Sequence, residues 1–584
     1  MVKLRGADII IEVLAEAGVE YMVGVPGHTV IDILDSLRTR QEKMKAIVVR
    51  NEESSGYIAD AYFRISGKPM AVLAHNSVGA ANTLTGVMNA MLDSSAMIVI
   101  TGDAWTQNQG RGAFQELSTS RDAGTPDIFR GSVKRSWQVN KAEKLPEVLL
   151  KAYKEAVSGR PGPVHIDVTQ EALAEWVEVD VLRSHKDFVP NSRVRGDAQA
   201  TREALGMLRE SSRPVILAGG GVTRGKAGAQ LVRLAEMLNV PVTTTSMGKG
   251  TIPDDHPLHL GVQGWVGTVP ANGALRDADV ILAFGCRFSE TDTAGWTDGA
   301  VFSIPPTRLI QVDIDPVEIA RYYPVAIGIV GHAGAVLEDM IALAEETDSS
   351  TMPNRDDWFN KIEKDRVAWA EDLKNAFDPA AVPIEPGRLT QELRKALPRD
   401  GIMMTDVGNS QKWIIQQFPI YAESSFITSL GGASMGFGPG GALGAKLAAP
   451  ERKVAIITGD GSMSMSLHIL PDLVEAGLPI VYIVANDSAW ASVNGPQQRR
   501  FGAEGGFFTL FKKPDGRPYY LDFSEVAKAC GMEAEHVSNP EDLEAAFDRA
   551  FACDGPYLID VTIRRDTYVP MTAMGAYPLP PTGQ

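Results

Sequence analysis

Apolar residues along the chain form short runs that alternate with amphipathic stretches of helical spacing. In the first third, apolar residues between Ala7 and Leu14 share one helical face and begin this alternation. Strands are predicted at 21–25, 46–49, 70–74 and 96–101, helices at 53–65 and 80–92, and a turn into a last strand at 159–168. Strands separated by helices predict a mostly parallel sheet, with functional residues at the carboxyl ends of its strands.

The same rhythm returns twice, after a polar connector at 184–197 and a charged helical one at 354–374. In the middle third, strands are predicted at 213–218, 240–245, 280–284 and 309–314 and a helix at 227–238. In the last third, strands are predicted at 401–406, 426–430, 454–458 and 479–485 and a helix at 464–476. We therefore predict an α/β fold of three doubly wound domains with mostly parallel sheets, at 1–175, 195–345 and 385–565, followed by a proline-rich tail at 566–584 that is a candidate lid.

Composition agrees with this organisation and narrows the partners. A length of 584 residues exceeds one core, and 44% hydrophobic and 22% charged residues are ordinary for a globular protein. The net charge of −17 argues against a nucleic acid or an anionic membrane as partner. No apolar run has the length of a bilayer span, and acidic residues interrupt the first apolar segment. Three scattered cysteines fit a reducing compartment, so we predict a cytoplasmic protein that acts on a small molecule.

The strongest chemical signal is Gly459-Asp460-Gly461-Ser462, followed 26 residues after Asp460 by Asn486-Asp487. A strand is predicted before each motif, so both should lie at the same edge of one sheet. Carboxylate and carbonyl oxygens are the ligands that Mg²⁺ prefers, and glycines let a backbone approach a diphosphate. The alternative is a structural turn in an ordinary doubly wound domain.

This arrangement resembles the metal and diphosphate motif of thiamine diphosphate enzymes, specifically the superfamily of acetolactate synthases, pyruvate oxidases and decarboxylases. The resemblance implies thiamine diphosphate and Mg²⁺ as cofactors, with Asp460, Asp487 and the Ala489 carbonyl as metal ligands. It implies cofactor contacts for Gly461, Ser462 and Asn486. The family has asparagine where Asp487 stands, so Asn486 remains an alternative ligand.

Two further motifs of the last third fit the same resemblance. The segment Val407-Gly408-Asn409-Ser410 matches the second diphosphate contact of the family. In Gly431 to Gly438, Ala433 is expected to offer its carbonyl to the 4′-amino group of the cofactor, and Met435 is expected to be the hydrophobic wedge between its two rings. A methionine is more often core filler, so this role follows from its position in the motif alone.

In the first third, the resemblance implies that Glu52 hydrogen-bonds the pyrimidine N1′ of the cofactor; the alternative is a pair of solvated glutamates at a helix start. His28 stands where related decarboxylases use aspartate, and an imidazole there could shuttle protons; the alternative is a turn histidine facing solvent. His75 and Asn76 could contact the same pocket. Gln115 is expected to reach the cofactor from a neighbouring subunit, so we expect a homodimer or homotetramer with active sites between subunits.

The middle third carries Gly219-Gly220-Gly221 after a strand, a turn that could admit a nucleotide diphosphate. In acetolactate synthases the equivalent domain holds FAD, and Arg287 and Asp313 match two of its contact positions. Three other positions depart from that pattern: Gln263, Thr291 and His332. FAD, ADP and a purely structural domain all remain open.

The resemblance implies an enzyme whose cofactor carbon C2, once deprotonated, attacks a carbonyl carbon. Our leading prediction is a carbon–carbon lyase or carboligase acting on a 2-oxo acid or a related 2-hydroxyacyl compound. Thr291 and Pro496 replace the arginine and tryptophan with which acetolactate synthases hold the second 2-oxo acid, so other substrates stay open. The alternatives are a 2-hydroxyacyl-CoA lyase, a cyclic 1,2-dione hydrolase suggested by His28, a flavin-linked 2-oxo acid oxidase, and a non-enzymatic paralogue.

Overall fold

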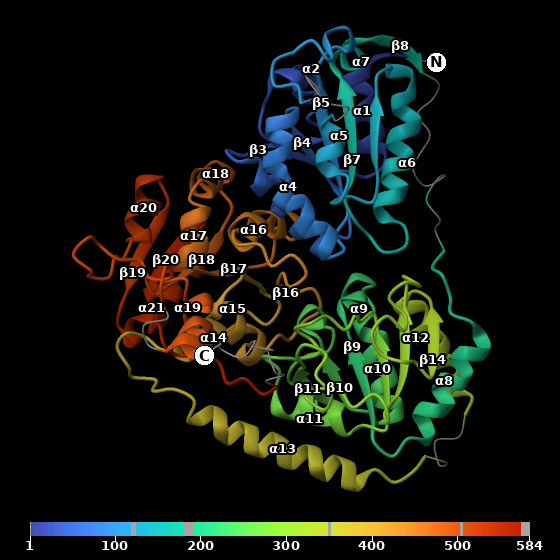
Figure 1. The fold of residues 1–584 in the computed structure, drawn as a ribbon, viewed down its shortest axis with the longest axis vertical. Coiled ribbons are helices and arrows are strands. Elements are labelled where there is room, and N and C mark those ends of the chain that lie inside the picture. The colour runs from blue at the N-terminus through green and yellow to red at the C-terminus, as the bar shows by residue number, and fades with distance from the viewer. Residues whose placement is uncertain are drawn as a thin grey trace.

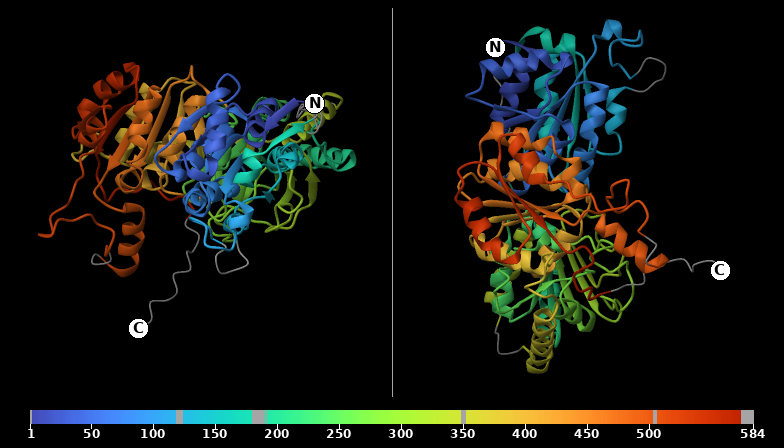
Figure 2. Two further views of the ribbon diagram at one scale, coloured as in Figure 1. Left: turned by 90° about the horizontal axis from the view of Figure 1, so that it is seen from above. Right: turned by 90° about the vertical axis from the view of Figure 1, so that its left-hand side faces the viewer.

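The computed structural model describes residues 2–117, 124–179, 189, 192–347, 352–502 and 506–573. Three six-stranded sheets, each with helices on both faces, form an N-terminal, a central and a C-terminal domain (Figure 1). All strand pairs within these three sheets are parallel, which confirms the predicted α/β fold class. Figure 2 shows the same arrangement from two further sides.

The N-terminal sheet has the strand order β3-β2-β4-β5-β7-β6. Its strands are β2 (Tyr21–Gly24), β3 (Lys45–Val48), β4 (Met70–Ala74), β5 (Met97–Asp103), β6 (Ser136–Val139) and β7 (Val164–Thr169). The helices that matter for the site follow strand ends: α3 (Glu52–Ser66) follows β3 and α4 (Ser77–Leu92) follows β4. A short antiparallel pair, β1 (Val2–Arg5) and β8 (Trp176–Val179), closes the domain.

The central sheet has the order β11-β10-β9-β12-β13-β14. Its strands are β9 (Pro214–Ala218), β10 (Val242–Thr244), β11 (His259–Val262), β12 (Val280–Phe284), β13 (Arg308–Asp313) and β14 (Ile327–Val330). Helices α8 (Ala198–Glu210), α9 (Gly220–Arg224), α10 (Gly228–Leu238), α11 (Val269–Asp277) and α12 (Ala333–Glu345) surround it. The charged connector is the long helix α13 (Asp356–Lys374), which runs along the bottom of Figure 1 toward the C-terminal domain.

The C-terminal sheet has the order β16-β15-β17-β18-β20-β19. Its strands are β15 (Ile402–Thr405), β16 (Phe426–Ile427), β17 (Val454–Gly459), β18 (Ile480–Asn486), β19 (Glu533–Val537) and β20 (Tyr557–Thr562). Its helices include α14 (Pro386–Ala396), α15 (Asn409–Gln417), α16 (Phe437–Ala448), α17 (Asp460–Met465), α18 (Ile469–Ala476), α19 (Ala491–Phe501), α20 (Phe523–Ala529) and α21 (Leu543–Ala552).

Small residues let the N- and C-terminal domains pack directly against each other. Helix α3 lies along α16, and a Cβ atom on Gly444 would sit 2.0 Å from the backbone oxygen of Ile58. On the other side of α3, a Cβ atom on Gly56 would lie 2.8 Å from the backbone of Gly86 in α4. Glycines at these two contacts are therefore a packing requirement, because backbones meet where side chains would otherwise separate them.

The structure differs from the predicted elements in one place that bears on the site. A single helix was expected at 464–476, but α17 begins at Asp460 and ends at Met465, and α18 begins at Ile469. The break places His468 at the domain contact, where its Nε2 lies 2.8 Å from the hydroxyl of Ser54. The described part of the tail, 566–573, is held to the other domains, since Gln416 donates to the Pro570 carbonyl and Asn272 to the Thr572 hydroxyl. The predicted lid role mostly concerns 574–584, which lie outside the described residues.

Candidate active site

Three of the predicted cofactor motifs lie at the carboxyl ends of adjacent strands. Strands β15, β17 and β18 are neighbours in the C-terminal sheet, and they end beside Asp406, Asp460 and Asp487 respectively. The sheet therefore brings together segments that are separated by up to 81 positions in the sequence. This edge is the position at which open parallel sheets bind their ligands.

Asp460 holds the turn that carries Asp487. One of its carboxylate oxygens accepts a 2.9 Å hydrogen bond from the Gly461 backbone N–H, and the other accepts a 3.1 Å bond from that of Ala489. Asp460 is 4% and Asp487 6% exposed. Burial raises the pKa of both carboxyls, and the nearby Asp460 carboxyl raises that of Asp487 further. Two acids held together away from water form a site that a cation would stabilise.

Several buried polar atoms around this turn have no partner within the described residues. They are Asp487 Oδ1, Ser410 Oγ and Asn409 Nδ2, and all three residues line one small cavity. Gly408, with a φ of +137°, and Gly459 both face open space, since a Cβ atom on either would meet nothing within 4 Å. Buried donors and acceptors normally have partners, so this edge has the chemistry expected of a site for Mg²⁺ and a diphosphate. The residues present therefore fit these two groups.

Asn486 has a different environment from Asp487. Its Nδ2 donates to the Leu521 carbonyl at 3.0 Å and to the Asp560 carboxylate at 3.1 Å. Asp560 is buried on β20 and also accepts a 3.0 Å bond from the Phe523 backbone N–H. The Asn486 side-chain oxygen has no partner within the described residues. Asn486 thus ties β18 to β20 through Asp560, a residue that the sequence did not single out.

Asp406 connects the remaining motifs of this domain. Its carboxylate accepts hydrogen bonds from the Val407 N–H at 2.9 Å, the Gly436 N–H at 3.0 Å and the Thr458 hydroxyl at 3.1 Å. The loop before α16 carries Ala433, with a φ of +46°, and Met435, whose side chain is 37% exposed. Ser462 is buried in α17. One buried acid therefore positions the loop of Met435 relative to both diphosphate motifs.

In the N-terminal domain, Glu52 begins α3 and is half-buried. Asn82 Nδ2 donates a 2.6 Å hydrogen bond to its carboxylate, and Gly79 leaves room beside it. The next residue, Glu53, instead accepts a 2.7 Å bond from the Tyr57 hydroxyl, which lies 3.5 Å from the Met435 carbonyl of the same chain. The two adjacent glutamates thus face different surroundings, and Glu52 faces α4.

His75 lies close to the other residues predicted for the site in this domain, His28 and Gln115. Its Nε2 lies 2.5 Å from the Gln115 side-chain oxygen, which can only accept, so the proton is on Nε2. The Thr29 hydroxyl then donates to Nδ1 at 2.6 Å, and the His28 ring centroid is 6.5 Å away. Burial and the nearby His28 lower the pKa of His75. Asn76 is fully buried and donates to the Phe114 carbonyl at 3.4 Å, so the turn after β4 holds the loop of Gln115.

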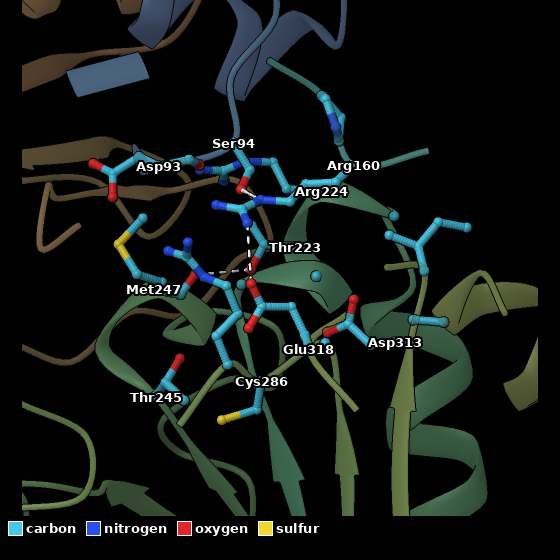
Figure 3. Close-up of a pocket in the computed structure, with 18 of the residues that line it drawn as sticks. Asp93, Ser94, Arg160, Thr223, Arg224, Thr245, Met247, Cys286, Asp313 and Glu318 are labelled. Carbon is cyan, nitrogen blue, oxygen red and sulfur yellow. Dashed lines mark hydrogen bonds and ion pairs between the residues drawn. The ribbon is translucent and has the colours of Figure 1, made fainter. Parts of the chain in front are cut away.

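A separate cavity of about 340 Å³ lies between the central domain and the other two (Figure 3). Arg160, Arg224 and Arg287 line it, together with Asp313 and Glu318. Arg224 Nη2 donates a 3.0 Å hydrogen bond to the backbone carbonyl of Asp93, but Arg224 Nε is buried without a partner within the described residues. Burial, with the nearby Arg64 guanidinium, lowers the pKa of Arg224 to about 10. A group of partly buried cations is suited to an anionic ligand.

The five positions compared with flavin-binding relatives divide into two groups. Arg287, Asp313 and His332 line the cavity, whereas Gln263 and Thr291 are not among its lining residues. The glycine turn 219–221 has a packing explanation in part, because a Cβ atom on Gly219 would lie 2.2 Å from the Gly285 carbonyl oxygen. The three glycines are therefore weaker support for a nucleotide than the arginines are.

Sequence reasoning missed a buried polar network that joins the domains. Asp93 accepts hydrogen bonds from Arg64 at 2.9 Å, the Ser429 hydroxyl at 2.6 Å and the Gly431 N–H at 2.8 Å. Ser429 Oγ in turn accepts a 3.0 Å bond from the Ala433 N–H. Charged residues inside apolar helices are a sequence signal for such networks, but their partners lie far away along the chain.

Comparisons with known proteins agree with this geometry. Models of the N-terminal TPP binding domain, the central domain and the C-terminal TPP binding domain of thiamine pyrophosphate enzymes match residues 4–122, 201–340 and 406–561. A probable acetolactate synthase large subunit of Methanococcus aeolicus is 32% identical over 98% of this chain and 94% of its own. The acetolactate synthase large subunit of Haemophilus influenzae is 32% identical over 98% and 97%, and that of isozyme 3 of Escherichia coli is 31% identical over 98% of each. The chain belongs to the thiamine pyrophosphate-dependent enzymes and is an acetolactate synthase-like member of that family.

Proposed function

We propose that the protein is a thiamine diphosphate- and Mg²⁺-dependent carbon–carbon carboligase or lyase that acts on a 2-oxo acid or a related 2-hydroxyacyl compound. The observation that carries the proposal is the set of unpartnered buried atoms at one sheet edge, on Asp487, Ser410 and Asn409. The relatives named as acetolactate synthases support the carboligase assignment.

In this proposal, Asp460, Asp487 and the Ala489 carbonyl hold Mg²⁺. The diphosphate lies against Val407 to Ser410 and against Gly461 and Ser462, with Asn486 bracing the turn. When bound, thiamine diphosphate supplies a carbon that adds to a carbonyl group and serves as an electron sink. Glu52 holds a proton at the pyrimidine end of the cofactor, and its hydrogen bond from Asn82 orients the carboxylate toward that role.

The ring-binding residues have complementary tasks. Met435 presents a flexible apolar side chain to solvent, which supports its role as the wedge between the two rings. His28 and His75 stand on the substrate side. Because His75 is held with its proton on Nε2, it positions Gln115, while the exposed imidazole of His28 is free to exchange protons with substrate.

We infer that two chains build each site. Glu52 faces α4, whereas Arg50 and Ser54 contact α18 and His468 of the same chain. On α4, Val78 is 57% and Met88 43% exposed, and they flank Asn82 on the outer face. An apolar stripe beside the proposed proton-holding residue supports a homodimer or homotetramer in which a second copy covers it.

Binding and adduct experiments test the proposal. Thiamine diphosphate with Mg²⁺ should bind in calorimetry, and binding should be lost in Asp460→Asn. The loaded protein is then offered 2-oxo acids, 2-hydroxyacyl-CoAs and cyclic 1,2-diones, and cofactor adducts are sought by mass spectrometry. Adducts from 2-oxo acids alone would support the carboligase or lyase, and absence of any cofactor binding would overturn the proposal.

One observation favours a hydrolytic branch as a second candidate. His28 lies beside His75 at the strand ends near Glu52, and its exposed imidazole can move protons to and from water. A cyclic 1,2-dione that is opened by the wild type but not by His28→Phe would support this branch.

The central cavity supports a nucleotide with a diphosphate, ADP or FAD, against Arg160, Arg224 and Arg287. The absorption spectrum of the purified protein distinguishes the two, since only FAD absorbs near 450 nm, and a flavin-linked oxidase requires it. We also infer a cytoplasmic location, which the free cysteines Cys286, Cys530 and Cys553 support. None of the helices in the described residues has the length and apolarity needed to cross a membrane.

A further inference from the structure

Arg565 lies beside the turn that carries Asp487, three residues after β20 ends. Its Nε donates a 2.8 Å hydrogen bond to the backbone oxygen of Asp487, and its Nη2 lies 3.4 Å from the backbone oxygen of Ser488. A planar guanidinium can hold two acceptors in a fixed geometry, which an ammonium group cannot do. The Arg565 guanidinium is therefore held against two successive peptide groups next to the Asp487 carboxylate.

The turn itself has an unusual backbone that needs support. Ser488 has a φ of +59°, a left-handed conformation that costs free energy for a residue with a side chain. Its hydroxyl donates to the Tyr519 carbonyl at 2.8 Å and to the Phe511 carbonyl at 3.2 Å. Arg565 contacts the turn from the segment that follows β20. It also lines the small cavity that Asn409, Ser410 and Asp487 share, so its charge lies at the proposed diphosphate site.

The charges at this place explain what a cation contributes. Asp460 and Asp487 bring two buried carboxylates together, and one divalent cation neutralises both. A diphosphate then adds at least two further negative charges next to them. Arg565 supplies a positive charge next to the Asp487 turn. The negative charge of Asp566, the next residue, partly cancels it, but Asp566 is exposed to solvent. A second cation, Lys412, has its Nζ 3.3 Å from the side-chain oxygen of Asn409, which lines the same cavity.

We propose that the charge of Arg565, held on the backbone oxygens of Asp487 and Ser488, offsets the Asp487 carboxylate, so that the site accepts an anionic diphosphate beside two acids. The inference rests on the proposed function. It assigns a role to a residue outside every motif that the sequence analysis used, and it makes Asp487 and Arg565 an interdependent pair.

The pair is tested by ligand affinities in the full-length protein. Thiamine diphosphate is titrated calorimetrically at saturating Mg²⁺, and Mn²⁺ alone is titrated with detection of the free ion by electron paramagnetic resonance. In Arg565→Gln, the Kd of thiamine diphosphate should rise about tenfold, while Mn²⁺ alone should bind unchanged or more tightly, because a neighbouring cation has been removed. Loss of a purely structural clamp would instead weaken both ligands together.

Two further variants separate charge from geometry. Arg565→Lys keeps the charge and should stay within about threefold of the wild type for the diphosphate. In the double variant Asp487→Asn with Arg565→Gln, the tenfold loss should shrink to about twofold, because the charge that Arg565 offsets is gone. Asp487→Asn alone should weaken Mn²⁺ but not the diphosphate, and it keeps the idea testable where Arg565→Gln fails to fold.

The control is Arg549→Gln, which removes the same charge from an exposed pair with Glu535 on the same domain. It should change neither affinity. The proposal is overturned by an unchanged diphosphate affinity in Arg565→Gln, by a parallel loss of Mn²⁺ and diphosphate, or by a full tenfold loss in the Asp487→Asn background. Failure of the wild type to bind thiamine diphosphate would instead overturn the proposed function, and this is measured first.

Discussion

The hydroxyl of Ser429 in the C-terminal domain donates a 2.6 Å hydrogen bond to the carboxylate of Asp93 in the N-terminal domain. The same carboxylate accepts from the Gly431 N–H and from Arg64, and Asp93, Ser429 and Arg64 are all buried. The Ser429 hydroxyl oxygen also accepts a hydrogen bond from the Ala433 N–H. The N-terminal domain thus determines where the loop of Ala433 and Met435 lies.

Replacing Asp93 should therefore cost both stability and cofactor affinity. Asp93→Asn removes the charge opposite a buried guanidinium, and loss of one partner of a buried pair costs about 3–5 kcal/mol. The free energy of unfolding from urea titration measures the loss. The control is Glu147→Gln, whose partner Lys151 is exposed, and this change should cost less than about 1 kcal/mol. Equal losses in both variants would contradict the role of Asp93.

The two adjacent glutamates should differ sharply in catalysis. Glu52→Gln should lower kcat by about 10² to 10⁴, the range of a lost proton-transfer group, while calorimetry still detects thiamine diphosphate binding. Glu53→Gln is the matched control, since Glu53 contacts Tyr57 rather than the proposed site, and its kcat should stay within a few-fold of the wild type. A larger loss in Glu53→Gln than in Glu52→Gln would show that the glutamates have been assigned the wrong way round.

Cofactor and metal should stabilise the fold together. With Mg²⁺ saturating and thiamine diphosphate at about 100 times its Kd, the cofactor adds about 2.7 kcal/mol, which corresponds to a rise in Tm of roughly 5–10 °C for a unit of about 150–250 residues that unfolds cooperatively. A chelator should reverse the shift because the diphosphate then meets two uncompensated acids. Differential scanning calorimetry checks this, with thiamine lacking the diphosphate as the control ligand. A shift that survives chelation would argue against the Asp460 and Asp487 metal site.

A buried histidine predicts how stability depends on pH. His165 is fully buried between the Thr101 and Ser136 hydroxyls, and burial lowers its pKa to about 3. The unfolded chain binds a proton below about pH 6.5 while the folded chain does not, so this contribution is complete above pH 6.5 and is lost as the pH falls toward 3. Between pH 7 and pH 5 it amounts to about 2 kcal/mol.

His165→Gln isolates that contribution. The stability difference between wild type and variant, measured by urea unfolding, should shrink by about 2 kcal/mol on going from pH 7 to pH 5. A difference that is the same at both pH values would show that His165 titrates normally in the folded protein.

The contact between α3 and α16 depends on a missing side chain. In Gly444→Ala, the added methyl group would lie 2.0 Å from the Ile58 carbonyl oxygen, so the helices must separate and the protein should lose at least 1–3 kcal/mol. In the control Gly206→Ala, on α8, the methyl group meets nothing within 4 Å, and the helix should gain up to about 1 kcal/mol. Thermal unfolding of both variants checks the opposite signs.

The fold could be predicted from the local pattern of apolar residues, because parallel strands that are covered on both faces have continuous apolar runs, such as 454–458 and 480–485. The positions of Asp460 and Asp487 followed from strand ends for the same reason. The pairing of Asp93 with Ser429 could not be predicted, since the two residues are 336 positions apart and neither belongs to a recognisable motif. Arg565 was missed because its role depends on two backbone carbonyls, which leave no trace in residue types.

The break between α17 and α18 was missed for a different reason. Apolar periodicity continues through 464–476, so the pattern gives no sign that α17 ends at Met465 and that α18 begins at Ile469. Glu52 and Glu53 could be told apart by position within the resembled motif, but only the Asn82 and Tyr57 contacts give the distinction a physical basis.

The close backbone contact of α3 with α16 has a consequence for how activity responds to dilution. With Ile58 and Gly444 touching directly, the two cofactor-binding halves within one chain keep a fixed separation and cannot swing together. If Glu52 serves the Asp460 cluster of another copy, a lone chain is folded yet inert. Specific activity should then fall as the protein is diluted, while the circular dichroism spectrum stays constant. Mixing Glu52→Gln chains with Asp460→Asn chains should restore up to one working site per mixed pair.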